Sequence, residues 1–221
     1  MPDVLQIDRL TAGYGEAIVL NQVSLALPEG QSLALLGRNG MGKTTLISSI
    51  VGVTRFVGGE IRLDGRDITG LRPDQRAHAG IGWVPQERNI FKSLTVEEIV
   101  EILGRFHLTV VMYERTGNLP YGKQRLLEIA LAIACRPHVL LLDEPAAGVP
   151  EDERHEILAT VAALPADVTV LLIEHDMDIV FSFADRISVL VNGALFVDGA
   201  PDEVARDPRV KAVYLGESLD A

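Results

Sequence analysis

Residues 37–44 read GRNGMGKT, and this stretch constrains the fold of the 221-residue chain more than any other. It fits the pattern GxxxxGK[ST], in which glycines let backbone N–H groups wrap closely around phosphate oxygens. A strand-like run, SLALL, precedes it and a helix-like run, TLISSIVG, follows it, as a phosphate loop requires. The helix that begins here also favours anions through its dipole. The sequence therefore predicts a nucleotide phosphate site formed by Gly37, Arg38, Asn39, Gly40, Met41, Gly42, Lys43, Thr44 and Thr45.

The phosphate loop and a later strand together predict a magnesium site. Lys43 is expected to reach the β and γ phosphates, and the Thr44 hydroxyl is expected to bind Mg²⁺. Residues 138–144 read HVLLLDE, an apolar run that ends in two carboxylates. A buried parallel strand delivers such residues to the ligand edge of its sheet. We therefore expect Asp143 to hold Mg²⁺ through water and Glu144 to polarise an attacking water.

Gln86 and His175 each follow a predicted strand, IGWVP and VLLIE respectively. Either residue taken alone is typical of a surface or capping position. In a parallel sheet, however, both strand ends lie at the same edge as the phosphate loop. Gln86 is then expected to contact the metal or the attacking water, and His175 the γ-phosphate.

Apolar strands alternate with helices in the second half of the chain, which predicts an α/β fold with a mostly parallel core sheet. The β-rich first half predicts an antiparallel subsheet beside it. Asp64-Gly65 and Asn192-Gly193 predict the turns of two hairpins. Residues from about 95 to 135 are expected to be mostly helical, and the acidic run EDERHE is expected to be a solvated helix face.

Charge and cysteine content restrict the partners and the compartment. The net charge of −11 argues against nucleic acid as the main partner, because a phosphate backbone needs clustered cations. The single cysteine, Cys135, allows no intrachain disulfide and fits a reducing compartment. No apolar run approaches the roughly 20 residues that span a bilayer, and MPDVLQIDRL lacks the pattern of a signal peptide. We expect a soluble chain that reaches a membrane only through a partner.

The segments GRNGMGKTT, LPYGKQ and VLLLDEP, with Gln86 and His175, occur in the order found in the nucleotide-binding subunits of ABC transporters. The chain resembles this family from about residue 7 to residue 215. The resemblance implies a P-loop ABC ATPase fold in which residues 1–221 form a single domain, with a shortened helical lobe inserted at about residues 92–135. It implies ATP and Mg²⁺ as cofactors and ATP hydrolysis coupled to transport. Tyr14 matches the aromatic residue that stacks on adenine in the family.

Residues 119–124 match the signature sequence of the same family. Two ATPase subunits close head to tail in the family, so that the signature of one faces the ATP of the other. The resemblance thus assigns this contact in trans to Leu119, Pro120, Tyr121, Gly122, Lys123 and Gln124. It also implies integral membrane permease subunits and, indirectly, a periplasmic solute-binding protein. The chain would then be cytoplasmic and peripheral on the inner face of the cell membrane.

The signature of this chain departs from the usual LSGGQ. Pro120 lacks both a hydroxyl and a backbone N–H, Tyr121 replaces a glycine, and Lys123 adds a positive charge. Variants such as LPYG resemble the ATPases of branched-chain and hydrophobic amino-acid importers, as does the ending DPRVKAVYLGE. We therefore interpret the chain as the ATPase subunit of such an importer.

Two alternatives to this function stay open on the sequence. Leu119 follows Gln86 by only 33 residues, which is shorter than usual in the family. This spacing, together with the altered signature, fits a degenerate subunit that binds ATP with weak hydrolysis. The short spacing reflects either a naturally short helical lobe, or a deletion or a recombination of two paralogues. A soluble non-transport ABC-type ATPase is the other alternative, which the acidic charge disfavours.

Overall fold

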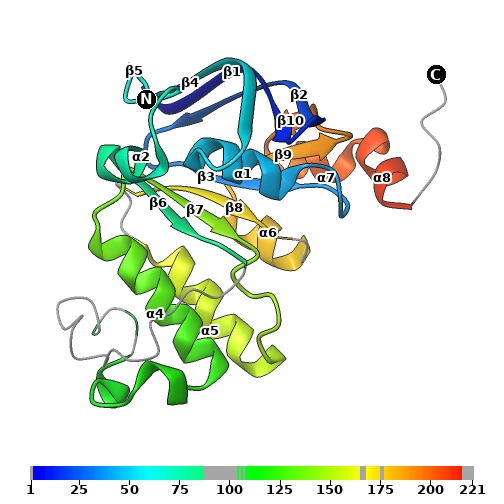
Figure 1. Ribbon diagram of the computed structural model, residues 1–221. Coiled ribbons are helices and arrows are strands. Elements are labelled where there is room, and N and C mark those ends of the chain that lie inside the picture. The colour runs from blue at the N-terminus through cyan, green and yellow to red at the C-terminus, as the bar shows by residue number, and fades with distance from the viewer. Residues whose placement is uncertain are drawn as a thin grey trace.

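A six-stranded sheet runs through the centre of the molecule in the computed structural model (Figure 1). The structure describes residues 2–86, 104, 106, 108–164, 168–174 and 177–215. The strand order is β10-β9-β3-β8-β7-β6, and all neighbours are parallel except β9 and β10. This confirms the predicted mostly parallel core sheet. Its strands are β3 (Ser32–Leu36), β6 (Ile81–Val84), β7 (Val139–Asp143), β8 (Thr169–Ile173), β9 (Arg186–Val191) and β10 (Ala194–Gly199).

The central strands β7 and β8 are buried along their whole length. They read as continuous apolar runs because protein covers the sheet on both faces. On β7, Leu141 packs into the core on one side of the sheet, whereas Leu140 and Leu142 pack into the core on the other. The chain thus leaves β7 with its final residue, Asp143, at the carboxyl edge of the sheet.

The second sheet is antiparallel, with the order β2-β1-β4-β5. β1 and β2 pair antiparallel until Tyr14 faces Ala17 across their turn. The sheet packs over α1 (Lys43–Val51), as Figure 1 shows, and the predicted antiparallel subsheet is confirmed. Its strands are β1 (Asp3–Tyr14), β2 (Ala17–Pro28), β4 (Arg55–Leu63) and β5 (Arg66–Asp67).

Both predicted hairpin turns are present. The turn at Asp64 and Gly65 has φ values of 49° and 73°. The turn at Asn192 and Gly193 has φ values of 48° and 74°. Positive φ at both central residues is the requirement of a type I′ turn, whose twist matches that of the flanking strands. The second turn also reaches the phosphate loop, because the Gly193 N–H donates to the Met41 carbonyl at 3.1 Å.

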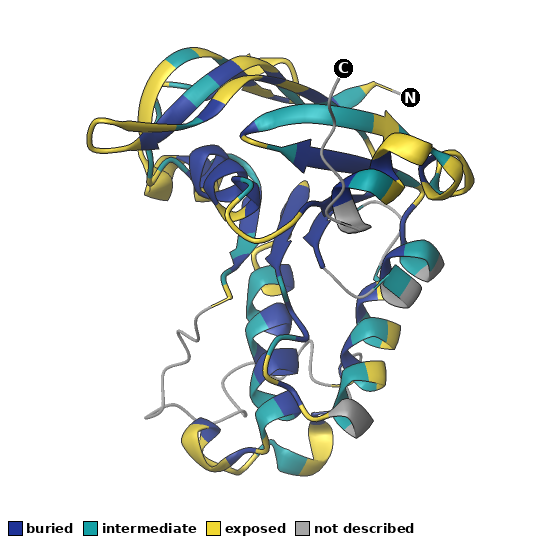
Figure 2. Cartoon of the chain, turned by 90° about the vertical axis from the view of Figure 1, so that its right-hand side faces the viewer, coloured by how far each residue is buried: buried dark blue, intermediate teal, exposed yellow. Residues whose placement is uncertain are grey.

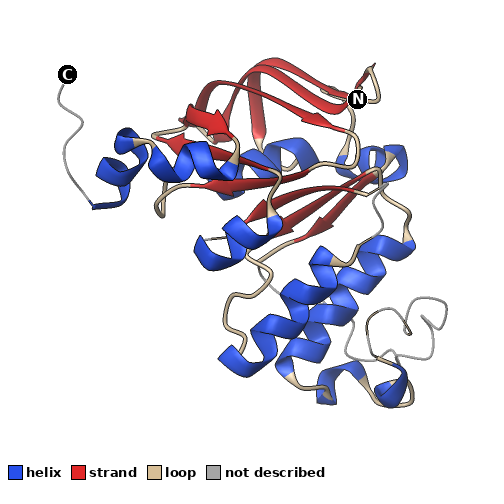
Figure 3. Ribbon diagram, turned by 180° about the vertical axis from the view of Figure 1, so that it is seen from behind, coloured by secondary structure: helices blue, strands red, loops and turns tan. Residues whose placement is uncertain are grey.

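Helices lie on both sides of the six-stranded sheet (Figures 1 and 3). α4 and α5 pack together through apolar side chains that include Leu126 and Ile129 of α4 and Ile157 of α5. In Figure 2 each of these two helices is buried along one side and more exposed along the other. Besides α1, the helices are α2 (Pro73–Ala79), α4 (Tyr121–Ala134), α5 (Glu151–Ala162), α6 (Met177–Phe183), α7 (Pro201–Arg206) and α8 (Pro208–Leu215).

The sequence analysis missed α2, which has only seven residues and therefore little periodicity. Its end signals are nevertheless present: Pro73 lies at the first position, Asp74 lies in the first turn, and Gly80 ends the helix. The buried Arg76 of α2 donates to the Ser49 carbonyl at 2.7 Å, near the end of α1. This contact fixes α1 from the side opposite to the phosphate loop.

The predicted helical stretch from residue 95 to 135 is described only in part. Its described portion contains two short 3₁₀ segments, Thr109–Val111 and Thr116–Asn118, followed by α4. Residues 87–103, 105 and 107 lie outside the described residues. None of the helices that the structure describes combines the length and the apolar composition needed to cross a membrane.

Candidate active site

The phosphate loop connects β3 to α1 and depends on glycine at several positions. Gly40 and Gly42 have φ values of 81° and 101°, which disfavour any residue with a side chain. Gly37 instead lies close to β9, since a Cβ built there would lie 2.5 Å from the Leu190 carbonyl oxygen. Gly42 immediately precedes α1, so the loop ends at the helix N-terminus.

A cleft of about 480 Å³ lies over this helix N-terminus. It brings together four segments of the chain, namely β2, the phosphate loop, the end of β6 and the end of β7. Three predicted loop residues, Gly37, Arg38 and Met41, do not line the cleft. The residues that line it are Val19, Asn39, Gly40, Gly42, Lys43, Thr44, Thr45, Gln86 and Glu144.

Lys43 is the cation of this cleft and is almost fully buried, with 6% of its surface exposed. Its Nζ donates to the carbonyl oxygens of Gly37 at 2.7 Å and Arg38 at 3.3 Å. Burial lowers the pKa of the Lys43 ammonium, and the nearby carboxylates of Glu144 and Asp143 oppose this effect. The loop therefore holds a positive charge where a phosphate would enter.

Asp143 and Thr44 lie close enough to share one ion. The Thr44 hydroxyl donates to Asp143 Oδ1 at 3.5 Å, and Asp143 is only 1% exposed. Burial raises the pKa of the Asp143 carboxyl, while the hydrogen bond from Thr44 acts in the opposite direction. A hydroxyl beside a carboxylate offers the oxygen ligands that Mg²⁺ prefers, and few protein ligands suffice when phosphates supply the others. The described residues contain no group of three or more His, Cys, Asp or Glu side chains that would hold a metal alone.

Glu144 and Gln86 meet across the cleft. Gln86 Nε2 donates to Glu144 Oε2 at 2.8 Å, although the two residues are 58 positions apart. Glu144 has a φ of 47°, which is uncommon for a residue with a side chain and is typical of functional sites. Its N–H still donates to the Ile173 carbonyl of β8 at 2.9 Å. The backbone thus turns sharply at the strand end and directs Glu144 into the cleft.

Two predicted site residues are not part of this constellation. Tyr14 lies at the end of β1, is 48% exposed and does not line the cleft, whereas Val19 of β2 does. His175 lies outside the described residues, directly after Glu174. Glu174 is buried and its Oε1 accepts a hydrogen bond from the Ala146 N–H at 3.2 Å, which ties the end of β8 to the loop after β7.

The six signature residues lie around the N-terminus of α4, outside the cleft; the last four of them belong to the helix. None of the six lines the cleft, although all six are described. Pro120 precedes the first helical residue, and Gln124 Nε2 donates back to the Leu119 carbonyl at 2.7 Å. The Gly122 N–H and the Lys123 ammonium contact carboxylates of α5, and the Tyr121 hydroxyl lies beside Gly148 in the loop after β7. Within one chain, the signature therefore lies outside the cleft that the phosphate loop lines.

The structure adds one residue that the sequence analysis missed, Arg125. It lies on α4, one residue beyond the signature, and is 3% exposed. Its guanidinium donates to the carbonyl oxygens of Pro85 at 2.7 Å, Pro145 at 3.0 Å and Asp143 at 3.2 Å. An arginine in an otherwise apolar stretch, with Glu128 three positions later, was the only available signal. Arg125 joins the signature helix to the residues that flank both Gln86 and Glu144.

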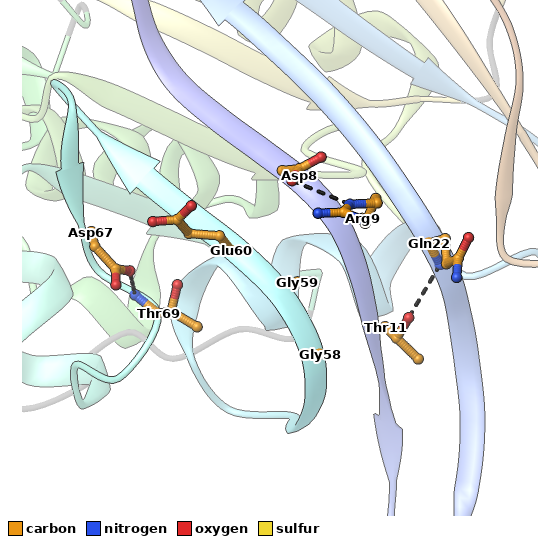
Figure 4. Close-up of a pocket in the computed structure, with 9 residues that line it drawn as sticks. All are labelled: Asp8, Arg9, Thr11, Gln22, Gly58, Gly59, Glu60, Asp67 and Thr69. Carbon is orange, nitrogen blue, oxygen red and sulfur yellow. Dashed lines mark hydrogen bonds and ion pairs between the residues drawn. The ribbon is translucent and has the colours of Figure 1, made fainter.

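A separate hollow of about 600 Å³ lies on the antiparallel sheet between β1, β2 and β4 (Figure 4). Its polar groups already contact one another. Arg9 donates to Asp8 at 3.3 Å, and the Thr69 N–H donates to Asp67 at 2.8 Å. It contains none of the predicted site residues, so it lies apart from the candidate active site.

The fold and the cleft define a phosphate-loop ATPase of the ATP-binding cassette type. The family model described as ABC transporter matches residues 20–147, and the chain belongs to this family. It therefore binds ATP and hydrolyses it as the ATP-binding subunit of a transporter. A second model, described as branched-chain amino acid ATP-binding cassette transporter, matches residues 196–220.

Individual relatives are similar over nearly the whole chain. The high-affinity branched-chain amino acid transport ATP-binding protein BraF of Pseudomonas aeruginosa is 35% identical, over 97% of this chain and 98% of its own length. The lipopolysaccharide export system ATP-binding protein LptB of Acidithiobacillus ferridurans is 32% identical, over 99% of each chain. The solved ADP conformation of an ATP-binding cassette of an ABC transporter is 28% identical, with a TM-score of 0.89 over 98% of this chain and 100% of that one.

Proposed function

We propose that this chain powers an ABC importer of branched-chain or other hydrophobic amino acids. The observation that carries the proposal is the match of residues 196–220 to the branched-chain transporter model. This match lies outside residues 20–147, which the general ABC transporter model matches, so it adds information that the ATPase motifs do not carry. The described part of the segment spans β10, α7 and α8, with the Arg209 guanidinium 5.5 Å from the centre of the Phe196 ring. The relative BraF, a branched-chain amino acid transport protein, supports the same solute class.

ATP would bind with its β and γ phosphates over the N-terminus of α1. Lys43 exchanges its contacts with loop carbonyls for phosphate oxygens, as the phosphate-loop lysine does in this motif. The loop residues from Gly37 to Thr45 supply backbone N–H groups, and Tyr14 is proposed to stack on the adenine. The glycine conformations described above leave the backbone open to such close approach.

The set formed by Thr44, Asp143 and Gln86 fits Mg²⁺, because it offers oxygen ligands beside the phosphate loop. When bound, this ion neutralises charge on the phosphates. Asp143 and Thr44 would hold the ion, and Gln86, which donates to Glu144, would offer its amide oxygen as a further ligand. Glu144 accepts a proton from the attacking water as general base, with its carboxylate oriented by Gln86. His175 is proposed to contact the γ-phosphate.

A second ATPase subunit completes the site in this proposal. The six residues 119–124 then face the ATP of that subunit, which is either another copy of this chain or a different ABC ATPase. α4 is a helix of 14 residues, and its N-terminus favours an anion. The whole chain, residues 1–221, is proposed to be one ATPase domain with the lobe at about residues 92–135 inserted.

A mainly apolar groove of about 820 Å³ between α2, β6 and the end of α4 offers a surface for the membrane permease. Val53 is 49% exposed there, and the indole N–H of Trp83 is buried with no hydrogen-bond partner among the described residues. Trp83 precedes Gln86 by three residues, so docking would act close to the cleft. The chain would then be peripheral on the cytoplasmic face of the membrane, and a periplasmic solute-binding protein would act through the permease.

A weakly hydrolysing subunit is the second candidate, and Pro120 is the observation that favours it. Pro120 occupies the position before α4 and makes no side-chain hydrogen bond to the helix. Both candidates bind ATP, but they differ in the rate at which they hydrolyse it. A weakly hydrolysing chain would release phosphate no faster than its own Glu144→Gln variant. The relatives described above are transport proteins, which disfavours a soluble non-transport ATPase.

Uptake of labelled leucine by cells tests the proposal directly. Removal of this chain should abolish ATP-dependent uptake, and the wild-type chain should restore it. The Lys43→Ala chain, produced at the same level, should fail because it lacks the phosphate-binding charge. Leucine uptake that survives removal of the chain would contradict the amino-acid importer and leave only the ATPase assignment.

A further inference from the structure

Two carboxylates of α5 hold the first turn of α4. The Gly122 N–H donates to Glu153 Oε2 at 2.6 Å, and Lys123 Nζ lies 2.5 Å from Glu156 Oε1. Glu153 and Glu156 are three positions apart, so they share one face of α5. The sequence led us to expect a solvated acidic face for the run EDERHE. Glu153 and Glu156 instead contact α4.

These carboxylates occupy the donors that the proposed function gives to a second subunit's nucleotide. Gly122 is buried, and a Cβ built on it would lie 2.3 Å from Glu153 Oε2, so this oxygen fills the space over the turn. A phosphate oxygen would need the same N–H. Two anions at one donor repel each other, so Glu153 must move away before a phosphate binds.

The contacts are not required to join the two helices. α4 and α5 already pack through side chains such as Leu126, Ile129 and Ile157, all of which are completely buried. The side chains of Lys123 and Glu156 are 22% and 37% exposed, and exposed ion pairs contribute little to stability. The Lys123–Glu156 pair is therefore not needed to hold the two helices together.

We propose that Glu153, assisted by Glu156, is an internal cap that competes with the nucleotide of the second ATPase subunit for the signature turn. This inference rests on the proposed function, because it needs a second subunit to present a phosphate. The cap keeps the turn occupied by its own chain until a nucleotide-loaded partner displaces it. It raises the ATP concentration at which two subunits close and so limits hydrolysis when ATP is scarce.

The test uses ATP-dependent dimerisation of the Glu144→Gln chain, measured by analytical ultracentrifugation with and without Mg-ATP. Addition of Glu153→Ala should lower the dimer dissociation constant about tenfold, the scale of one hydrogen bond to a charged group. Glu153→Gln keeps an acceptor oxygen but loses the charge. The dimer dissociation constant of this variant should therefore lie between that of the Glu144→Gln parent and that of the Glu153→Ala variant. Asp202→Ala removes a carboxylate from the remote helix α7 and should change nothing.

Each result separates this inference from the proposed function. A Glu153→Ala chain that dimerises no more tightly than its parent overturns the cap, including the case in which both stay monomeric. The cap is also overturned if dimerisation weakens, because Glu153 would then support the turn. If Glu153→Ala fails to bind ATP at its own phosphate loop, Glu153→Gln decides in its place. Failure of the parent chain to bind ATP would instead overturn the proposed function, and the cap with it.

Discussion

Asp143 and Glu144 are neighbours in the sequence with different surroundings, and the difference suits two tasks. Asp143 is 1% exposed, and burial raises its pKa, so its charged form is held at a cost that a bound cation would offset. Glu144 lines the cleft, accepts a hydrogen bond from Gln86 and has the unusual φ of 47°. The buried carboxylate suits a metal ligand, and the accessible one suits a base.

Replacement of Glu144 by Gln should stop turnover while ATP still binds. The amide keeps the shape of the side chain but cannot accept a proton from water, so phosphate release should fall by about 10² or more. Calorimetry should show nucleotide affinity within about twofold of the parent. Glu203→Gln on α7 makes the same chemical change outside the cleft and should leave turnover intact. Wild-type turnover in the Glu144→Gln chain would remove Glu144 from the role of base.

Asp143→Asn should stabilise the free chain in a pH-dependent way. A carboxyl whose pKa is raised on folding costs stability above its folded-state pKa, and this cost disappears below its unfolded-state pKa. The neutral amide carries no such cost, so at pH 7 the Tm should rise by about 2–4 °C, the shift expected for about 1 kcal/mol. The difference between the two chains should shrink as the pH falls towards 4. A difference that grows in acid would contradict the raised pKa.

At the scale of elements, α4 connects parts of the site that only tertiary packing brings together. Arg125 reaches the carbonyls of Asp143 and Pro85, which are 18 and 40 positions away in the sequence. The phosphate loop, the strand before Asp143 and both hairpin turns could be predicted, because each depends on neighbouring residues. The acceptors of Arg125 and the contact of Gly122 with Glu153 could not, since they depend on how α4 and α5 pack against the sheet.

Arg125→Lys should separate positioning from stability. Lysine keeps the charge but cannot donate to three carbonyls at once from a planar fork. Loss of these contacts should lower kcat by about tenfold to a hundredfold, because small misplacements of catalytic groups have that effect. The KM for ATP should change little, since Arg125 does not line the cleft. Steady-state kinetics together with thermal melting measure both effects. A lowered Tm with kcat unchanged would make Arg125 purely structural.

At the scale of the whole molecule, the two proposed halves of the reaction site do not meet within one chain. Lys43 and Glu144 line the cleft over α1, whereas Gly122 lies at the start of α4 and outside that cleft. The family resemblance predicts that the signature acts on the nucleotide of a second subunit, and this contact stays a proposal. Each proposed ATP site therefore takes its phosphate loop from one subunit and its signature from the other.

The separation of the two halves means that defects in them can complement each other. Lys43→Ala removes the phosphate loop from use, and Gly122→Asp removes the signature, so each chain alone should be inactive. In an equal mixture that forms dimers at random, a pair with one chain of each kind contains one site with both halves intact. About one quarter of the wild-type hydrolysis should then return if each site works alone. Such recovery would identify the second subunit as another copy of this chain, whereas a different partner ATPase would leave the mixture as inactive as its components.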